Sequence, residues 1–183
     1  STEVLAAIGR LITCWAGIET ALPLQIGRLV AIGPDLDTGR LAIDQPSYTK
    51  AAAAFGGTNP RAAVMQIRNL LAVFDSREAT TAAAKKAGER LIALFERRNE
   101  IAHQVAEQGK SRHSLRLRCL QASKGSMWME KHYTIDEIDA WTNELKEQAR
   151  TIDALITSAT GYTWKQIEED RERFIQARAK LVD

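Results

Sequence analysis

Apolar residues recur at helical spacing over residues 2–32, and this long stripe constrains the fold more than any other feature of the chain. Every third or fourth position is apolar, which gathers these side chains on one helical face. They are Val4, Ile8, Leu11, Ile12, Trp15, Ile18, Leu22, Ile26 and Leu29. Pro23 predicts a bend, because proline removes a backbone hydrogen bond, and Gly33-Pro34 predicts the helix end. Such a face must be covered by other elements, so we expect a helical bundle.

The middle of the chain predicts a long connection followed by another helix. Residues 33–59 are rich in glycine and proline and include a short alanine-rich helix over residues 47–55. Asn59 before Pro60 is typical of an N-cap followed by proline in the first helical turn. We expect the helix that they open to run over residues 60–74.

A longer helix and a β-hairpin come next. We expect the helix to begin at Asp75 or Ser76 and to run to about Glu107, with Gly109 marking its end. Residues 113–133 then alternate apolar and polar side chains around a turn, a period of two that is typical of a hairpin. The alternating positions of its first strand are Leu115, Arg116, Leu117, Arg118 and Cys119.

Two helices with similar start signals complete the chain. Thr134 and Glu137 have the spacing of a capping box, in which each side chain binds the backbone N–H of the other residue. This helix is predicted over residues 134–159, with Gly161 after its end. The same kind of signal opens a highly charged helix over residues 163–181, whose narrow apolar stripe suits a packing or oligomer contact.

Composition agrees with one folded domain over residues 1–183. Hydrophobic residues make up 45% of the chain and charged residues 26%, near the averages for soluble domains. We expect an all-α fold, a bundle of four to five main helices with a small β-hairpin inserted after residues 76–107. No basic-then-apolar signal segment and no apolar run of roughly 18–20 residues is present. Cys14 and Cys119 lack the spacing of a disulfide framework, so we expect a cytoplasmic protein without membrane association.

The net charge of +2 does not by itself indicate a nucleic-acid binder, which usually has a strong basic excess or a concentrated basic patch. The densest basic run comprises Arg112, Arg116 and Arg118, with Lys110 and Lys124 nearby. This run is a candidate RNA-binding surface. The alternative is a solvated strand face or turn, as such runs often are.

The most informative short segment is the hexapeptide from Arg98 to His103, Arg-Asn-Glu-Ile-Ala-His. It resembles the motif of the HEPN superfamily, in which an arginine and a polar residue, often asparagine, are followed by three residues and a histidine. HEPN domains are helical bundles of four or five helices, and the predicted order of elements is similar over residues 2–160. The resemblance implies a HEPN-like fold.

In catalytic members of that superfamily the arginine and the histidine cut RNA without a metal. The resemblance therefore implies an endoribonuclease that leaves a 2′,3′-cyclic phosphate, of a kind found among toxins and defence proteins. His103 would transfer protons, because histidine exchanges them near neutral pH. Arg98 would stabilise the phosphate, because its fork of N–H donors matches the phosphoryl oxygens. Asn99 would orient both catalytic groups.

The resemblance also implies partners. HEPN enzymes characteristically dimerise with their motifs facing each other, so we expect a homodimer with RNA as substrate and an antitoxin or another protein as a candidate partner. Some toxin members carry a tyrosine two residues after the histidine, which a partner nucleotidyltransferase modifies. Gln104 and Val105 follow His103 in this chain, so that modification has no acceptor at the matching position.

No metal or cofactor is expected from the sequence. The three histidines and two cysteines have no metal-ligand spacing. The glycine pair at Gly56 and Gly57 lacks the lysine and the following helix pattern of a phosphate-binding loop. A nuclease in this chain would therefore depend on side chains alone.

Helical geometry places Arg98 in a core-facing stripe. At about 100° per residue, the apolar residues within about 60° of Arg98 are Leu91, Leu94, Phe95, Ile101, Ala102 and Val105. A buried guanidinium needs a partner, and Glu19, four residues after Trp15 in the stripe of the first helix, is the candidate. His103 points about 140° away from Arg98, beside Asn99, whose side chain can hold the imidazole.

This placement leaves an alternative function open. An arginine committed to a buried carboxylate is less available for a phosphate group. The chain would then be a non-catalytic HEPN-like binding or dimerisation module, in which Arg98 and Glu19 form a structural ion pair.

Overall fold

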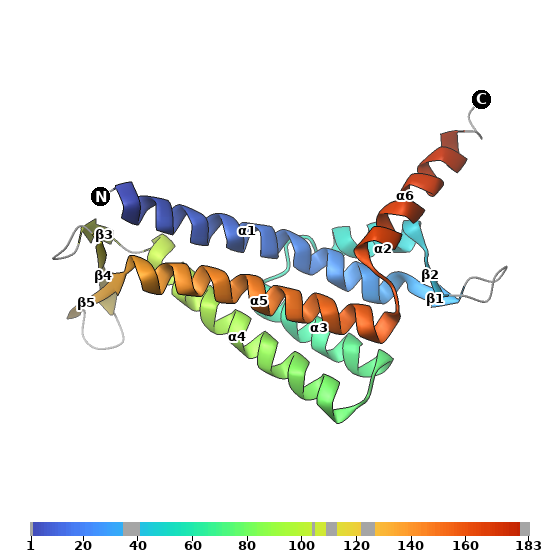
Figure 1. The fold of residues 1–183 in the computed structure, drawn as a ribbon, viewed down its shortest axis with the longest axis horizontal. Coiled ribbons are helices and arrows are strands. Elements are labelled where there is room, and N and C mark those ends of the chain that lie inside the picture. The colour runs from blue at the N-terminus through green and yellow to red at the C-terminus, as the bar shows by residue number, and fades with distance from the viewer. Residues whose placement is uncertain (1, 35–40, 104, 109–112, 122–126, 180–183) are drawn as a thin grey trace. The chain divides into compact units, whose positions relative to one another are not determined.

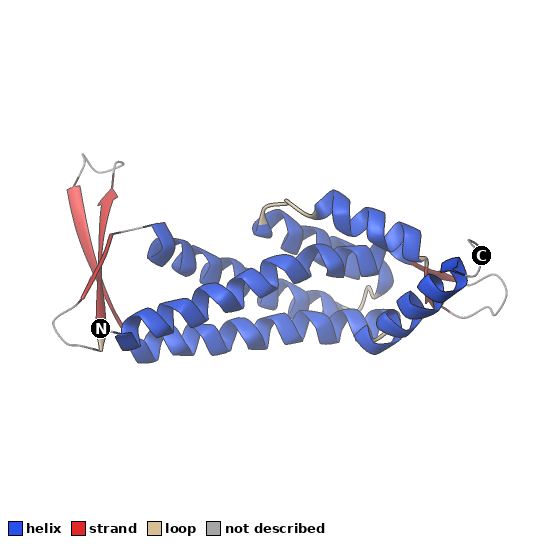
Figure 2. Cartoon of the chain, turned by 90° about the horizontal axis from the view of Figure 1, so that it is seen from above, coloured by secondary structure: helices blue, strands red, loops and turns tan. Residues whose placement is uncertain are grey.

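The computed structural model describes residues 2–34, 41–103, 105–108, 113–121 and 127–179. These residues are mostly helical and add two small antiparallel sheets (Figure 1). In chain order the elements are α1 (Thr2–Ala31), β1 (Ile32–Pro34), β2 (Leu41–Ile43), α2 (Gln45–Phe55), α3 (Pro60–Phe74), α4 (Glu78–His103), β3 (Val105–Gln108), β4 (Ser114–Gln121), β5 (Met127–Thr134), α5 (Ile135–Thr160) and α6 (Trp164–Ala179). Figure 2 shows the helices and strands in separate colours.

The predicted helices are confirmed, and several of their end signals act as expected. The Asn59 side chain accepts a hydrogen bond from the backbone N–H of Arg61 at 2.9 Å, which caps α3. At the start of α5 the Thr134 N–H donates to the Glu137 carboxylate at 2.7 Å, and the Glu137 N–H donates to the Thr134 hydroxyl at 3.2 Å. Gly161 follows α5 with φ of 66°, a left-handed conformation that favours glycine.

Backbone contacts group the chain into two compact units. The first combines residues 1–18 with 89–149, and the second combines residues 19–88 with 150–183. The prediction that residues 1–183 form a single domain is not tested by this grouping and stays a prediction.

The first unit contains the sheet β3–β4–β5 with parts of α1, α4 and α5. Its core is apolar and includes one aromatic stack, in which the rings of Trp15 and Phe95 lie 5.0 Å apart between centroids. The buried apolar side chains of this unit are Val4, Ala7, Leu11, Trp15, Ile18, Leu91, Leu94, Ile101, Leu115, Leu117, Tyr133, Ile138 and Leu145.

The predicted hairpin is confirmed as β4 and β5, which pair antiparallel. Leu115 and Leu117 are buried while Arg116 between them is partly exposed, as a period of two requires. A third strand, β3, pairs antiparallel with β4 and was not predicted. The predicted end of the motif helix near Glu107 is therefore wrong, because α4 ends at His103 and Val105 begins a strand.

The predicted start of that helix also needs correction. α4 begins at Glu78, slightly later than Asp75 or Ser76. The backbone N–H of Asp75 still bonds the last turn of α3, and its carboxylate accepts hydrogen bonds from the Arg77 N–H at 3.1 Å and the Thr80 hydroxyl at 2.8 Å. Asp75 thus caps the end of α3, and its carboxylate binds Thr80 in the first turn of α4.

The second unit contains the β1–β2 ribbon, α2, α3, α6 and the remaining parts of α1, α4 and α5. The connection predicted over residues 33–59 holds α2, close to the expected range, and strand β2, which was not expected. β1 and β2 contribute Ile32 and Ile43 to a small apolar cluster. Its other members are Ala31, Tyr162 and Ile167. The main core of the unit includes Leu22, Ile26, Leu29, Val64, Ile67, Leu71, Ile152 and Ile156.

A buried charge lies inside the second unit. Arg28 of α1 is fully buried, and its Nη1 donates to the Asp153 carboxylate of α5 at 2.9 Å. Its Nη2 donates to the Thr157 hydroxyl at 2.8 Å, and the Gln25 amide donates to the same carboxylate at 3.0 Å. Burial lowers the pKa of the Arg28 guanidinium, although the charge of Asp153 opposes this shift.

Among the described residues, α1 alone is a helix long and apolar enough to cross a bilayer by length and composition. The core helix of a soluble protein and a signal sequence satisfy the same two criteria. The expectation that no segment of the chain approaches this threshold is therefore corrected, and the expected absence of a membrane partner stays a prediction.

Candidate catalytic site

The last turns of α4 carry the hexapeptide and belong to the first unit. Leu94 and Ile101 are buried on one side of this segment, while Ala102 and His103 are exposed. The core-facing stripe predicted from helical spacing therefore ends at Ile101. Beyond it the chain leaves the helix and enters β3.

Arg98 lies at the edge of this core. Its side chain is half-buried, and its Nε is fully buried without a hydrogen-bond partner among the residues described. Its Nη1 donates to the Oδ1 of Asn99 at 2.9 Å. A neutral amide does not compensate the charge of a guanidinium, so this side chain retains capacity for an anionic group.

The Asn99 side chain forms a hydrogen bond with Arg98 rather than with His103. The predicted role of its side chain was to hold the imidazole, whereas its Oδ1 accepts from the arginine. The amide nitrogen of Asn99 remains able to donate. Asn99 therefore orients the Arg98 guanidinium, which is the candidate group for binding phosphate.

His103 is the last residue of α4 and is exposed. Exposure gives the ring access to solvent and to a substrate. Arg98 and His103 thus differ in surroundings, as their different helical faces predict.

Glu100, at the centre of the hexapeptide, joins α4 to β5 and was missed as a site residue. Its carboxylate accepts from the Lys131 Nζ at 2.6 Å and from the Tyr133 hydroxyl at 3.0 Å. Arg97 lies 3.5 Å from the same carboxylate and 5.9 Å from the ring centroid of Trp141. The spacing of Lys131 and Tyr133 along the predicted strand places both on one face of it, but it does not identify Glu100 as their partner.

The surroundings of Glu100 set the ionisation of this cluster. Burial raises the pKa of the Glu100 carboxyl, but the hydrogen bonds from Lys131 and Tyr133 outweigh it and hold the pKa below its usual range. The carboxylate in turn raises the pKa of Lys131. Burial, followed by the hydrogen bond to Glu100, raises the pKa of the Tyr133 hydroxyl. The shifts of Glu100 and Lys131 both favour the charged forms of this pair at neutral pH.

Two of the three candidate RNA-binding arginines, Arg116 and Arg118, lie on β4. Arg116 lies 3.8 Å from Glu130 of the neighbouring strand. Arg118 occupies the β4 position directly opposite Glu130 in β5. Arg112 lies outside the described residues. A carboxylate therefore lies near Arg116, and the role of the three arginines in binding RNA stays a prediction.

Two further expectations concern partners of the site. Glu19 belongs to the second unit and Arg98 to the first, so their pairing stays a prediction. In the described portion of the chain no group of three or more histidine, cysteine, aspartate or glutamate residues is arranged to hold a metal ion.

Comparison with known proteins adds no relative, since no family model, curated protein or solved structure matches the chain.

Proposed function

We propose that the chain is a HEPN-type endoribonuclease that cleaves RNA without a metal and leaves a 2′,3′-cyclic phosphate. The observations that carry the proposal are the state of the Arg98 side chain and the exposure of His103 on another face of the same helix. The guanidinium is half-buried, and its hydrogen bond within the hexapeptide goes to a neutral amide. A half-buried cation without a carboxylate partner in its own segment suits a phosphate group.

The chemistry requires three roles. A base takes the proton of a ribose 2′-hydroxyl, whose oxygen attacks the adjacent phosphorus, and an acid protonates the departing 5′-oxygen. His103 suits proton transfer, and Arg98 suits the charge that develops on the phosphoryl oxygens. Asn99 positions the guanidinium through the bond at 2.9 Å.

A homodimer belongs to the proposal. Arg98 and His103 lie on helical faces about 140° apart, which is unfavourable for one site built within one chain. Two chains related by a two-fold axis place the arginine of one beside the histidine of the other. A toxin or defence role in the cytoplasm, with an antitoxin or another protein as partner, is the biological setting that we propose for such an enzyme.

The alternative is a non-catalytic HEPN-like binding or dimerisation module. The observation that favours it is the structural role of Glu100. This residue lies within the hexapeptide, and its carboxylate joins α4 to β5. In this alternative Arg98 serves as the structural partner of Glu19.

The test is RNA cleavage by the purified protein in EDTA. We expect cleavage to persist in EDTA and to fall by at least about 100-fold in His103→Ala, the usual contribution of a positioned acid or base. His132→Ala is the matched control, because His132 is an exposed histidine outside the hexapeptide. Equal cleavage by the wild type and His103→Ala would show that a contaminant cuts the RNA.

A further inference from the structure

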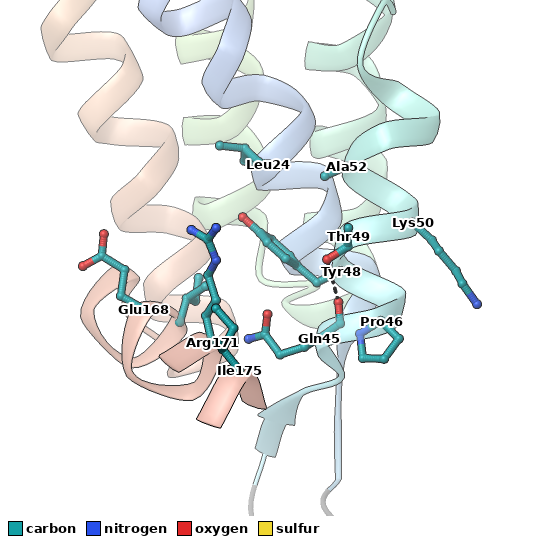
Figure 3. A pocket seen from close by; sticks show the side chains of 11 residues that line it. Leu24, Gln45, Pro46, Tyr48, Thr49, Lys50, Ala52, Glu168, Arg171 and Ile175 are labelled. Carbon is teal, nitrogen blue, oxygen red and sulfur yellow. Dashed lines mark hydrogen bonds between the residues drawn. The ribbon is translucent and has the colours of Figure 1, made fainter. Parts of the chain in front are cut away.

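The second unit contains a pocket between α1, α2 and α6 (Figure 3). Its volume is about 680 Å³, within the range of roughly 300–1,000 Å³ of small-molecule sites. The wall is mostly apolar, which is also usual for such sites. The apolar lining residues are Leu24, Pro46, Ala52, Ile167 and Ile175.

Gln45 is the first sign that this pocket binds something. It is the first residue of α2, and only 8% of its surface is exposed. Its amide nitrogen is buried without a hydrogen-bond partner in the described part of the chain. A buried donor without a partner is costly. Figure 3 shows this amide turned toward the pocket and Arg171.

Tyr48 and Arg171 supply two more donors. Both side chains extend into the same space in Figure 3, the tyrosine from α2 and the arginine from α6. Burial raises the pKa of the Tyr48 hydroxyl, while the positive charges of Arg171 and Arg28 lower it. The charge of Arg171 therefore acts at the hydroxyl group.

The other charged side chains that line the pocket are turned away from it. In Figure 3 the Glu168 carboxylate and the Lys50 ammonium both point outward from the space that Gln45, Tyr48 and Arg171 face. The Thr49 hydroxyl is already used, since it donates to the backbone carbonyl of Gln45 at 3.0 Å. Among the described lining residues, the polar groups that face the pocket are therefore the Gln45 amide, the Tyr48 hydroxyl and the Arg171 guanidinium.

We propose that this pocket binds a small carboxylate with an apolar body, such as a medium-chain fatty acid or an aryl carboxylate. The carboxylate accepts hydrogen bonds from Arg171, Tyr48 and the Gln45 amide, whose last bond turns easily. The apolar body lies against Leu24, Ile167 and Ile175. An acceptor-only head group satisfies the buried amide nitrogen, which a purely apolar ligand would leave without a partner.

The test uses titration calorimetry of the full chain with sodium octanoate at neutral pH. Octanol has the same apolar body without the charge, and inorganic phosphate has charge without an apolar body. We expect saturable binding of octanoate, binding of octanol at least about tenfold weaker, and no saturable binding of phosphate. Equal affinity for octanoate and octanol, or no saturation by octanoate, would overturn the proposal.

Three variants locate the site. Arg171→Gln should weaken octanoate binding about tenfold by removing one charge-assisted hydrogen bond. Arg173→Gln, on the same helix but outside the pocket lining, should bind as the wild type does. Gln45→Leu should weaken binding while the free protein melts no lower than the wild type, because a buried unpaired amide is removed. Unchanged binding by Arg171→Gln would contradict the assignment.

Discussion

Arg28 and Arg98 show how the surroundings of one residue type decide its role. Arg28 is fully buried, and its guanidinium donates hydrogen bonds to Asp153 and Thr157 within the second unit. Arg98 is half-buried and bonded to a neutral amide. The first arginine is structural, and the second is the candidate for binding phosphate.

The buried pair in the second unit should be sensitive to loss of its carboxylate. Asp153→Asn removes the carboxylate charge that faces the buried Arg28 guanidinium, and we expect the free energy of unfolding to fall by about 3 kcal/mol. Asp139→Asn breaks the exposed pair with Arg10 and should cost less than about 1 kcal/mol. Urea unfolding of both variants measures the difference. Similar losses in the two variants would show that the Arg28 charge is not desolvated.

Glu100 should give the first unit a pH-dependent stability. Its pKa is lowered in the folded chain, so its contribution is present above the unfolded-state pKa of about 4.3 and is lost as pH falls through the folded value. At neutral pH Glu100→Gln should lower the free energy of unfolding by about 2 kcal/mol, the loss of charge-assisted hydrogen bonds. Urea unfolding at a series of pH values should show this difference shrinking as pH falls below about 4.3. A difference that stays constant with pH would contradict this account.

At the scale of elements, the crossing of α3 and α4 depends on a glycine. A Cβ at Gly88 would lie 2.7 Å from the Val64 Cγ1, and valine has little freedom to move away. Gly88→Ala should therefore lower the free energy of unfolding by about 1–2 kcal/mol through overpacking. Gly17→Ala in α1, where a Cβ would meet nothing within 4 Å, should raise it by about 0.5–1 kcal/mol. Thermal or urea unfolding that ranks the two variants in the opposite order would refute the close approach.

The helices could be predicted from sequence because their signals are local. The Asn59 cap and the capping box of Thr134 and Glu137 each act within three residues, and the structure shows their bonds. The end of α4 could not be predicted, because Val105 leaves the helix to pair with Arg118 in another strand. Short strands such as β1 and β2 depend in the same way on a partner distant in sequence.

The candidate site shows the same division between local and distant interactions. Helical spacing predicts Arg98 in the core-facing stripe, whereas the structure has this side chain half-buried at the edge of the core. The hydrogen bond between Asn99 and Arg98 was not predicted. Helical spacing favours contacts between side chains four residues apart, which predicts Asn99 beside His103 instead. The pairs Glu100–Lys131 and Arg28–Asp153 join residues 31 and 125 positions apart, and no local pattern predicts such partners.

At the scale of the whole molecule, the proposed dimer predicts complementation between inactive chains. Arg98→Ala and His103→Ala each remove one half of a composite site. In an equal mixture about half of the dimers are mixed, and each has one complete site, so about one quarter of wild-type activity should return. Cleavage of RNA by each variant alone and by the mixture measures this. Mixed dimers that form but stay inactive would show that the site is not shared between chains.

The central claim is that this chain cuts RNA by internal attack of the 2′-hydroxyl without a metal. The most direct measurement is mass spectrometry of the RNA fragments made in EDTA by the wild type and by His103→Ala. We expect fragments ending in a 2′,3′-cyclic phosphate with the wild type and intact RNA with the variant. Fragments with 3′-hydroxyl ends, or the same fragments from both proteins, would contradict it.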